Sequence, residues 1–352
     1  MSVDPVVDSP GEDSGRRRAV MADVAKLAGV SHMTVSRVIN DHPAVSSATR
    51  ERVLAAMAQL AYRPNIAART LVTGRTRRLG VISVDTTLYG PASMLVAIER
   101  AARDAGYAVA IASLPALDRR ALGDAVDFLT SQAVEGIIAI TPHTTTMAAL
   151  RHVPTGVPFV AVEGGKAAVP TVAVDQYLGA FLATRHLLAL GHATVVHIGG
   201  PQDWYEAPER ERGWRDALVA EDREVPEVVV GDWSARSGHE AAKQLLGIPG
   251  LSAVFVANDQ MALGVLRALH EAQVSVPDDI SVVGFDDIPE AAYFTPPLTT
   301  VRQDFGEVGR QGLDLLLEQV EGAPRSRRRR VIPPDLVIRK STTVPLTRLD
   351  SP

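Results

Sequence analysis

The sequence predicts an α/β protein, with a small three-helix head at the N-terminus and a large core of two doubly wound parallel-sheet subdomains. Three observations indicate this fold class. A helix-turn-helix pattern lies near the N-terminus, short apolar runs alternate with amphipathic helices from residue 79 onward, and these runs are too many for one sheet. The length of 352 residues allows two or three domains.

The first helix of the head follows from residues 23–40, which read DVAKLAGVSHMTVSRVIN. Asp23 is a capping residue, and an apolar stripe at helical spacing follows it, formed by Val24, Ala25, Leu27 and Ala28. Gly29 supplies the permissive backbone needed where this helix ends. Val30 fills the corner before the second helix.

The second helix presents two different faces. Ser31 can cap it, and its inward face is formed by Val35, Val38 and Ile39. The remaining side chains are left for the outer faces: His32, Met33, Thr34, Ser36 and Arg37. This arrangement is typical of a helix that locks to its partner on one side and enters a DNA groove on the other. An ordinary helical hairpin with solvated Arg and His is the alternative on spacing alone.

A third helix begins at Ser46, and Tyr62 and Pro64 end it. Its expected apolar face consists of Val53, Leu54, Met57 and Leu60. Residues 65–72 favour helix, but a segment this short is marginal in water and suited to ordering upon binding. We therefore expect a disordered tail at 1–18, a helix-turn-helix domain at 19–64, and a hinge helix and linker at 65–78.

The core is expected to alternate strands and helices. Candidate strands are 79–84, 108–113, 136–140, 159–162, 171–174, 195–199, 253–257 and 281–285. Candidate helices are 94–105, 121–131, 178–190, 208–220, 237–246, 259–272 and 304–319. Ligands bind such sheets at the carboxyl ends of strands, where this chain has Asp85, Glu163, Asp175, Asn258, Asp259, Asp286 and Asp287. Capping of the following helix explains each of these polar residues about as well.

Charge is divided unevenly along the chain. Residues 19–78 carry nine Lys or Arg against three Asp or Glu, a formal charge of +6, whereas residues 79–352 carry 24 against 34, a charge of −10. A basic head on an acidic body predicts a polyanion as partner of the head alone. The arginine run at 327–330 lies between Pro324 and Pro333, and we interpret it as a solvated loop.

Several function classes find no support in the sequence. There is no cysteine, no apolar run long enough for a membrane helix, and no signal-peptide core, so we expect a cytoplasmic protein without membrane contact. We find no nucleophile elbow, no glycine-rich dinucleotide motif after a strand, no P-loop and no metal-binding cluster. We therefore expect neither an enzyme nor a cofactor nor a metal, and the basic head opposes a secreted sugar-binding protein.

Residues 20–344 resemble the LacI family (LacI/GalR) of bacterial transcription regulators. Residues 23–40 resemble the family's headpiece, and YRPNIAARTLVTGRTRRLGV resembles its hinge and first core strand. GDWSARSG, FVANDQMALGVLRAL, DISVVGFDD and PPLTTVRQDF resemble its core. The resemblance implies a core like that of periplasmic sugar-binding proteins, with one subdomain at 79–174 and 302–333, the other at 175–301 and 334–346, and a tail at 347–352.

The resemblance also implies DNA contacts. It places base-reading side chains at His32, Met33 and Arg37 and phosphate contacts at Ser31, Thr34, Ser36 and Asn40. Within the hinge, Leu71 matches the family's minor-groove wedge, and we include Asn65 and Arg69 as further DNA contacts. Packing of Leu71 against the body is the alternative.

Positions that match the family's effector contacts lie between the two core halves. They are Leu88, Glu163, Arg210, Trp233, Asn258, Asp286, Gln303 and Phe305, and we add Trp204 because it precedes Arg210 closely in a loop. An indole face can cover a pyranose, and Arg and Asp can bond adjacent hydroxyls. A core tryptophan is the alternative for Trp233.

Two positions depart from a well-known family member, since Glu163 replaces a shorter aspartate and Glu206 replaces a small hydroxyl residue. The absence of a leucine-heptad tail predicts a homodimer. The expected function is repression of sugar-utilisation genes from a pseudo-palindromic operator, with release by a sugar or glycoside. The alternative is a purine-type repressor that needs a bound corepressor.

Overall fold

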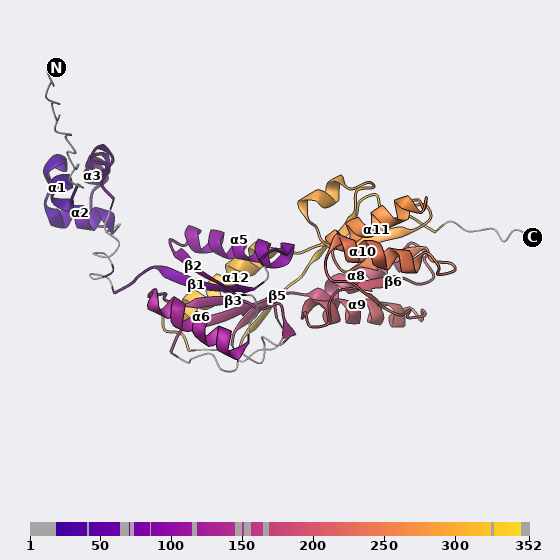
Figure 1. Cartoon of the computed structure of the whole chain (residues 1–352). Coiled ribbons are helices and arrows are strands. Elements are labelled where there is room, and N and C mark those ends of the chain that lie inside the picture. The colour runs from indigo at the N-terminus through magenta and orange to yellow at the C-terminus, as the bar shows by residue number, and fades with distance from the viewer. Residues whose placement is uncertain are drawn as a thin grey trace, which may run out of the picture. The chain divides into compact units, whose positions relative to one another are not determined.

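The computed structural model describes residues 19–40, 42–63, 70, 74–84, 86–114, 118–144, 150, 156–164, 169–324 and 327–345. The chain divides into two compact units, residues 1–76 and 77–352 (Figure 1). Asn65, Arg69, Leu71, Asp85 and both expected tails lie outside the described residues. Their predicted roles therefore stay predictions.

The head consists of α1 (Met21–Ala28), α2 (His32–Ile39) and α3 (Ser47–Gln59). Two predicted caps are confirmed, because the Ser31 hydroxyl accepts from the Thr34 amide at 3.1 Å and the Ser46 hydroxyl accepts from the Thr49 amide at 3.4 Å. Gly29 ends α1 with a φ of 65°, as expected for a left-handed residue at a helix end.

The capping role predicted for Asp23 needs correction. The helix begins two residues earlier, with Val20 as its N-cap, and Asp23 is the third helical residue. Its carboxylate accepts a hydrogen bond from the Val20 backbone amide at 2.9 Å. Asp23 thus stabilises the helix start from inside the first turn, where a carboxylate also meets the positive end of the helix dipole.

All three helices contribute to the small core of the head. Its buried members are Val24, Ala25, Ala28, Val35, Val38, Val53 and Ala56. Two predicted core residues are wrong, since Leu27 is 46% exposed and Leu54 is 52% exposed. Each lies about 100° around its helix from the centre of the buried face, which the close packing of alanines has narrowed.

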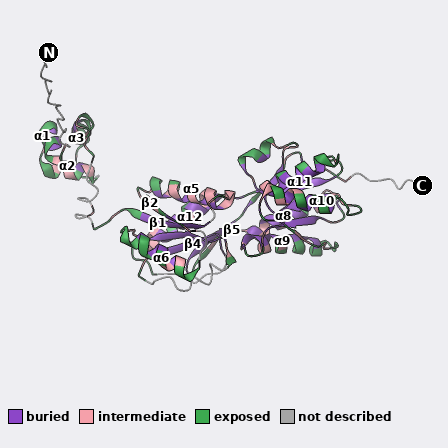
Figure 2. Ribbon diagram, in the orientation of Figure 1, coloured by how far each residue is buried: buried purple, intermediate pink, exposed green. Residues whose placement is uncertain are grey.

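The first core sheet contains six parallel strands in the order β11-β5-β4-β3-β1-β2. Their bounds are β1 (Arg78–Val84), β2 (Ala108–Leu114), β3 (Ile137–Ile140), β4 (Phe159–Val162), β5 (Thr171–Val174) and β11 (Arg329–Ile332). Successive side chains of β1 point to opposite faces of the sheet. Val81 packs with α5 (Tyr89–Asp104) and α12 (Phe305–Val320), and Ile82 packs with α6 (Arg119–Ser131). Buried strands covered by helices on both faces identify a doubly wound subdomain (Figure 2).

The second core sheet has the order β12-β10-β9-β8-β6-β7. Its strands are β6 (Val196–Gly199), β7 (Val229–Val230), β8 (Ala253–Val256), β9 (Ser281–Asp286), β10 (Thr299–Arg302) and β12 (Asp335–Val337). One face is covered by α10 (Ala235–Leu245) and α11 (Asp259–Glu271), the other by α8 (Gln176–Ala189) and α9 (Glu206–Ala220). A short 3-10 helix, η2 (Pro289–Tyr293), follows β9. The predicted fold class is confirmed, with β12 as an antiparallel edge strand.

The arginine run at 327–330 is the predicted solvated loop only in its first half, where Arg327 and Arg328 are exposed and outside any strand. Its last two residues begin β11, which pairs in parallel with β5 from Arg329 to Ile332. Arg328 and Arg330 form ion pairs with Glu318 at 3.3 and 3.2 Å. Only one residue of this edge strand, Ile332, is buried, so the apolar pattern that marks a strand is missing from the sequence.

The polypeptide passes between the two core sheets three times, between β5 and α8, between β10 and α12, and between β11 and β12. The carboxyl ends of β4 and β9 therefore come to opposite sides of one cavity. Among the described helices, none combines the length and the hydropathy that crossing a bilayer requires.

Candidate functional site

A cavity of about 540 Å³, counted with its solvent-open part, is lined by residues of both core subdomains. From the first subdomain come Leu88, Tyr89, Gly90, Pro91, Ile140, Pro142, Glu163 and Phe305, and from the second come Trp204, Glu206, Arg210, Trp233, Asn258, Gln260, Asp286 and, at the crossover, Gln303. We call this space the core cavity.

The structure brings all nine predicted effector residues together in the lining of the core cavity. Seven lining residues were not among the predicted contacts: Tyr89, Gly90, Pro91, Ile140, Pro142, Glu206 and Gln260. The sequence did carry a signal for Glu206, since it lies four residues before Arg210 on α9 and helical spacing places both on one face.

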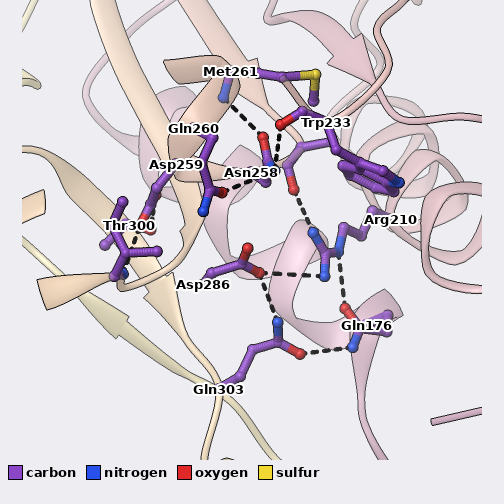
Figure 3. Close-up of polar contacts among 12 residues, drawn as sticks. Gln176, Arg210, Trp233, Asn258, Asp259, Gln260, Met261, Asp286, Thr300 and Gln303 are labelled. Atoms are coloured by element: carbon purple, nitrogen blue, oxygen red, sulfur yellow. Dashed lines mark hydrogen bonds and ion pairs between the residues drawn. The ribbon is translucent and has the colours of Figure 1, made fainter. Parts of the chain in front are cut away.

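A buried hydrogen-bond network holds Arg210 in place (Figure 3). Its guanidinium donates to the Gln176 side chain at 2.8 Å, to the Ala257 carbonyl, and to Asp286 at 3.5 Å. Gln303 donates to the same Asp286 oxygen at 2.7 Å and accepts from Gln176 at 2.8 Å. The network fixes an acceptor, Asp286, and a cation, Arg210, before any ligand arrives.

Two tryptophans line the second subdomain's side of the core cavity, Trp204 and Trp233. Trp204 and Trp233 meet edge to face, with ring centroids 5.7 Å apart. The Arg210 guanidinium carbon lies 3.7 Å from the Phe285 ring centroid and 5.6 Å from that of Trp233. Asn258 caps α11 and also donates to the Trp233 carbonyl at 3.1 Å, so the start of that helix positions the indole.

Backbone strain is concentrated at the cavity. Glu163, Trp233 and Asp286 have φ values of 54°, 71° and 108°, a left-handed region that residues other than glycine seldom adopt. Each such residue costs on the order of 1–3 kcal/mol, and such strain is typical of sites where the direction of a side chain matters for function. The three side chains are thereby directed at the cavity from two different subdomains.

Three buried carboxyl oxygens in the cavity accept no hydrogen bond from the described part of the chain. They are both oxygens of Glu163 and Oε2 of Glu206. Burial, and then the charge of Glu206, raises the pKa of Glu163 to about 8. Burial raises the pKa of Glu206 to about 7, against the opposing effect of Arg210. Asp286, also buried, has a pKa raised to about 6.

We expect the stability of the core to fall as the pH rises from 5 to 8.5, and the replacement Glu163→Gln to reduce this fall. Because the folded-state pKa is raised, the folded chain keeps protons that the unfolded chain has lost, and this stabilisation disappears as pH passes about 8. The variant should therefore gain about 1–2 kcal/mol over the parent at high pH and nothing at low pH. Urea unfolding followed by fluorescence of the three tryptophans measures this; equal pH slopes in both proteins would contradict it.

The other polar residues at strand ends have structural roles. Asp175 caps α8 by accepting from the Leu178 amide at 2.9 Å. Asp259 is buried and accepts from Thr300 at 2.6 Å, and Asp287 pairs with Arg302 and Arg339 at 2.6 Å each. For these three the capping or packing explanation is the right one. Among the described residues no cluster of three potential metal ligands occurs.

In the head, α2 presents a polar surface opposite its buried Val35 and Val38. His32, Met33 and Arg37 are exposed, and Met33 is 63% exposed. Thr34 and Ser36 are half-buried, and Asn40 donates to the Ser36 carbonyl at 3.0 Å. The predicted base-reading residues are therefore all accessible on α2, with His32 and Met33 in its first turn and Arg37 in its last, as entry into a major groove requires.

Comparison with known proteins gives two family matches. Residues 20–65 match the model described as bacterial regulatory proteins, lacI family, and residues 184–342 match the periplasmic binding protein-like domain. The chain is 36% identical to the lactose operon repressor of Escherichia coli over 335 residues, covering 94% of this chain and 92% of that one. It is 36% identical over 341 residues to the regulator CelR of Thermobifida fusca, covering 93% and 99%.

Solved structures of the same family are similar to this chain over most of its length. A crystal structure of the lac repressor dimer bound to operator and an anti-inducer has a TM-score of 0.78 at 35% identity and covers 93% of this chain and 100% of that one. A complex of CelR with cellobiose has a TM-score of 0.67 at 32% identity and covers 92% and 100%.

Proposed function

The chain belongs to the LacI family of bacterial regulatory proteins, and from this premise we propose that it represses sugar-utilisation genes and leaves its operator when a saccharide occupies the core cavity. The observation that carries the proposal is the convergence of Arg210, Asp286 and Trp233 on one cavity between two subdomains. Regulation of transcription by a small molecule needs two distinct sites, one for DNA and one for the ligand. This chain would carry the first in its head and the second in its core.

A saccharide suits this cavity better than other small molecules. The indole faces of Trp204 and Trp233 can cover the C–H face of a sugar ring, and Asp286 can accept from its hydroxyls. Two relatives support the class of ligand, since one is named for lactose and another has been solved with cellobiose. Lining residues from both subdomains mean that a bound sugar favours one relative position of the two over another.

We propose that the chain acts as a homodimer on a pseudo-palindromic operator. Each head places α2 in the major groove, where Arg37 bonds a guanine edge and Met33 lies against a thymine methyl. Ser31, Thr34, Ser36 and Asn40 bond phosphates and fix the register. The hinge residues Asn65, Arg69 and Leu71 contact the minor groove at the dimer centre.

Two measurements test the coupling of sugar to DNA. A thermal-shift screen of mono- and disaccharides identifies the effector, because a ligand of the native state raises the melting temperature. Sugar affinity is then measured with and without operator DNA, selected from a genomic library. Operator should weaken sugar binding by the factor by which sugar weakens operator binding. Equal sugar affinity in both states would refute the proposal, and a sugar that tightens operator binding would establish the purine-type alternative, a corepressor.

Replacing Arg37 with alanine should weaken binding to the selected operator by about 1–3 kcal/mol and relax the preference for one base pair. Arg37 is exposed on α2 and no described side chain would be left unpaired, so the head should stay folded. Binding of the variant to an operator library measures both effects. Arg52→Ala on α3, at an exposed site, is the matched control, and a loss that is uniform over all DNA sequences would contradict base reading by Arg37.

A further inference from the structure

The charge of Arg210 is already engaged within the protein. The guanidinium donates to Asp286, to the Gln176 side chain and to the Ala257 carbonyl, and it stacks over Phe285 at 3.7 Å. The Arg210 side chain is 5% exposed and that of Asp286 is 8% exposed, so the two form a buried pair. Arg210 therefore offers a ligand little further cationic character.

Glu163 and Glu206 form no ion pair of this kind with any described residue: each feels the charge of Arg210, which lowers its pKa, but their nearest polar neighbours include each other. Their residues are 5% and 7% exposed, and three of their carboxyl oxygens are buried without a hydrogen bond among the described residues. Glu163 reaches the cavity from the end of β4 and Glu206 from the first turn of α9, so the two subdomains contribute one carboxyl each. Buried carboxylates are costly unless a cation or several donors satisfy them.

The lining of the core cavity thus contains three carboxyl groups and one guanidinium. Full ionisation leaves two negative charges in excess, both on acceptor-only oxygens. A third unsatisfied group points to the same ligand: Nε1 of Trp233 is a buried donor without a partner in the described structure, and it needs an acceptor such as a sugar oxygen. A ligand complementary to the cavity therefore carries several hydrogen-bond donors, a positive charge and at least one acceptor.

We propose, on the basis of the function proposed above, that the effector is a saccharide with a protonated amino group, which binds between the carboxylates of Glu163 and Glu206. An ammonium supplies three donors and the missing charge, and hydroxyls supply the acceptor for Trp233. A neutral sugar meets the same two groups with their protons still bound and supplies no positive charge that favours their ionisation. In this proposal one bound ammonium contacts both subdomains, through Glu163 of the first and Glu206 of the second.

Proton exchange provides a second signature. The titratable and charged groups that face the pair are Arg210, Asp286 and Tyr205. Without ligand, burial keeps protons on Glu163 and Glu206 toward neutral pH, with pKa values of about 8 and about 7. An ammonium favours the charged carboxylates, so its binding must release protons, whereas the binding of a neutral sugar does not.

Matched probe sets test the proposal on the full-length protein. The sets are glucosamine with glucose and N-acetylglucosamine, galactosamine with galactose and N-acetylgalactosamine, and chitosan disaccharide with cellobiose and diacetylchitobiose. Titration calorimetry near pH 6.5, in two buffers of different ionisation enthalpy, gives affinity and proton release together. We expect an amine to bind on the order of tenfold or more tighter than its neutral counterparts, with net proton release.

Two variants complete the test. Glu163→Gln and Glu206→Gln should each remove most of the preference for the amine and most of the proton release, and Glu290→Gln, at an exposed site, should keep both. If a neutral sugar binds as tightly as its amine, the inference is overturned while the proposed function stands. The same holds if sugars bind but neither glutamine variant changes the preference for the amine. If no member of any set binds and none changes operator affinity, both are overturned.

Discussion

Replacing Arg210 with methionine should destabilise the core by about 3–5 kcal/mol near neutral pH. The substitution leaves Asp286, the Gln176 side chain and the Ala257 carbonyl without their shared donor, and both Asp286 and Gln176 are buried. Methionine fills similar space, so the loss reports on the uncompensated polar groups rather than on a void. Urea unfolding followed by tryptophan fluorescence measures it, because all three tryptophans lie in the same subdomain as Arg210.

The pH dependence of that loss separates charge from packing. Asp286 has a pKa raised to about 6 even with Arg210 present, and without the guanidinium it takes up a proton more readily. The destabilisation should therefore shrink as pH falls toward about 5. Adding Asp286→Asn should likewise recover part of the lost stability. A loss that is the same at both pH values and is unchanged in the double variant would show that Arg210 acts only through packing.

Replacing Trp233 with alanine should abolish the response to effector while operator binding persists. The indole contributes an apolar face and a free Nε1–H to the cavity, and both are lost. Such a loss should weaken effector binding by about 100-fold, as for a buried aromatic anchor. Calorimetric titration and effector-induced release of DNA measure the two halves of the prediction.

Trp233→Phe is the matched variant, since it retains a ring but removes the nitrogen donor. It should keep the response at a higher effector concentration. If the same concentration of effector still releases the alanine variant from DNA, Trp233 does not contribute to effector binding. A phenylalanine variant as defective as the alanine variant would show that the Nε1–H carries the interaction.

The sequence predicted most of the buried strands, because runs such as 159–162 and 171–174 are apolar on both faces and admit no other register. It missed β10, an interior strand of the second sheet, because Thr299 and Thr300 are buried there without an apolar run to mark them. It predicted the edge strand β2 but missed the other three edge strands, β7, β11 and β12. β11 buries Ile332 alone, and β7 is two residues long, so neither carries a periodic apolar signal. The largest error at a helix start is at α5, which begins at Tyr89 rather than at the predicted residue 94 and has no side-chain cap.

For the cavity, family resemblance located residues that no local pattern connects, such as Leu88 and Gln303. What the sequence does not reveal is which polar groups are already satisfied within the protein. Arg210 and Glu206 are four residues apart on one helix, yet Arg210 is fully bonded and Glu206 keeps a buried oxygen without a partner. That difference depends on Gln176, Asp286 and Ala257, which only the tertiary structure brings together.

The three passages of the chain between the core sheets have a consequence for unfolding. Neither half of the core is a continuous segment, so neither can come apart without pulling on strands that belong to the other, such as β11 and β12. Calorimetry should therefore record one cooperative endotherm for residues 77–345, separate from that of the head. A single cut in one passage should leave the halves tied by the remaining two, and such nicked protein should still melt as a unit.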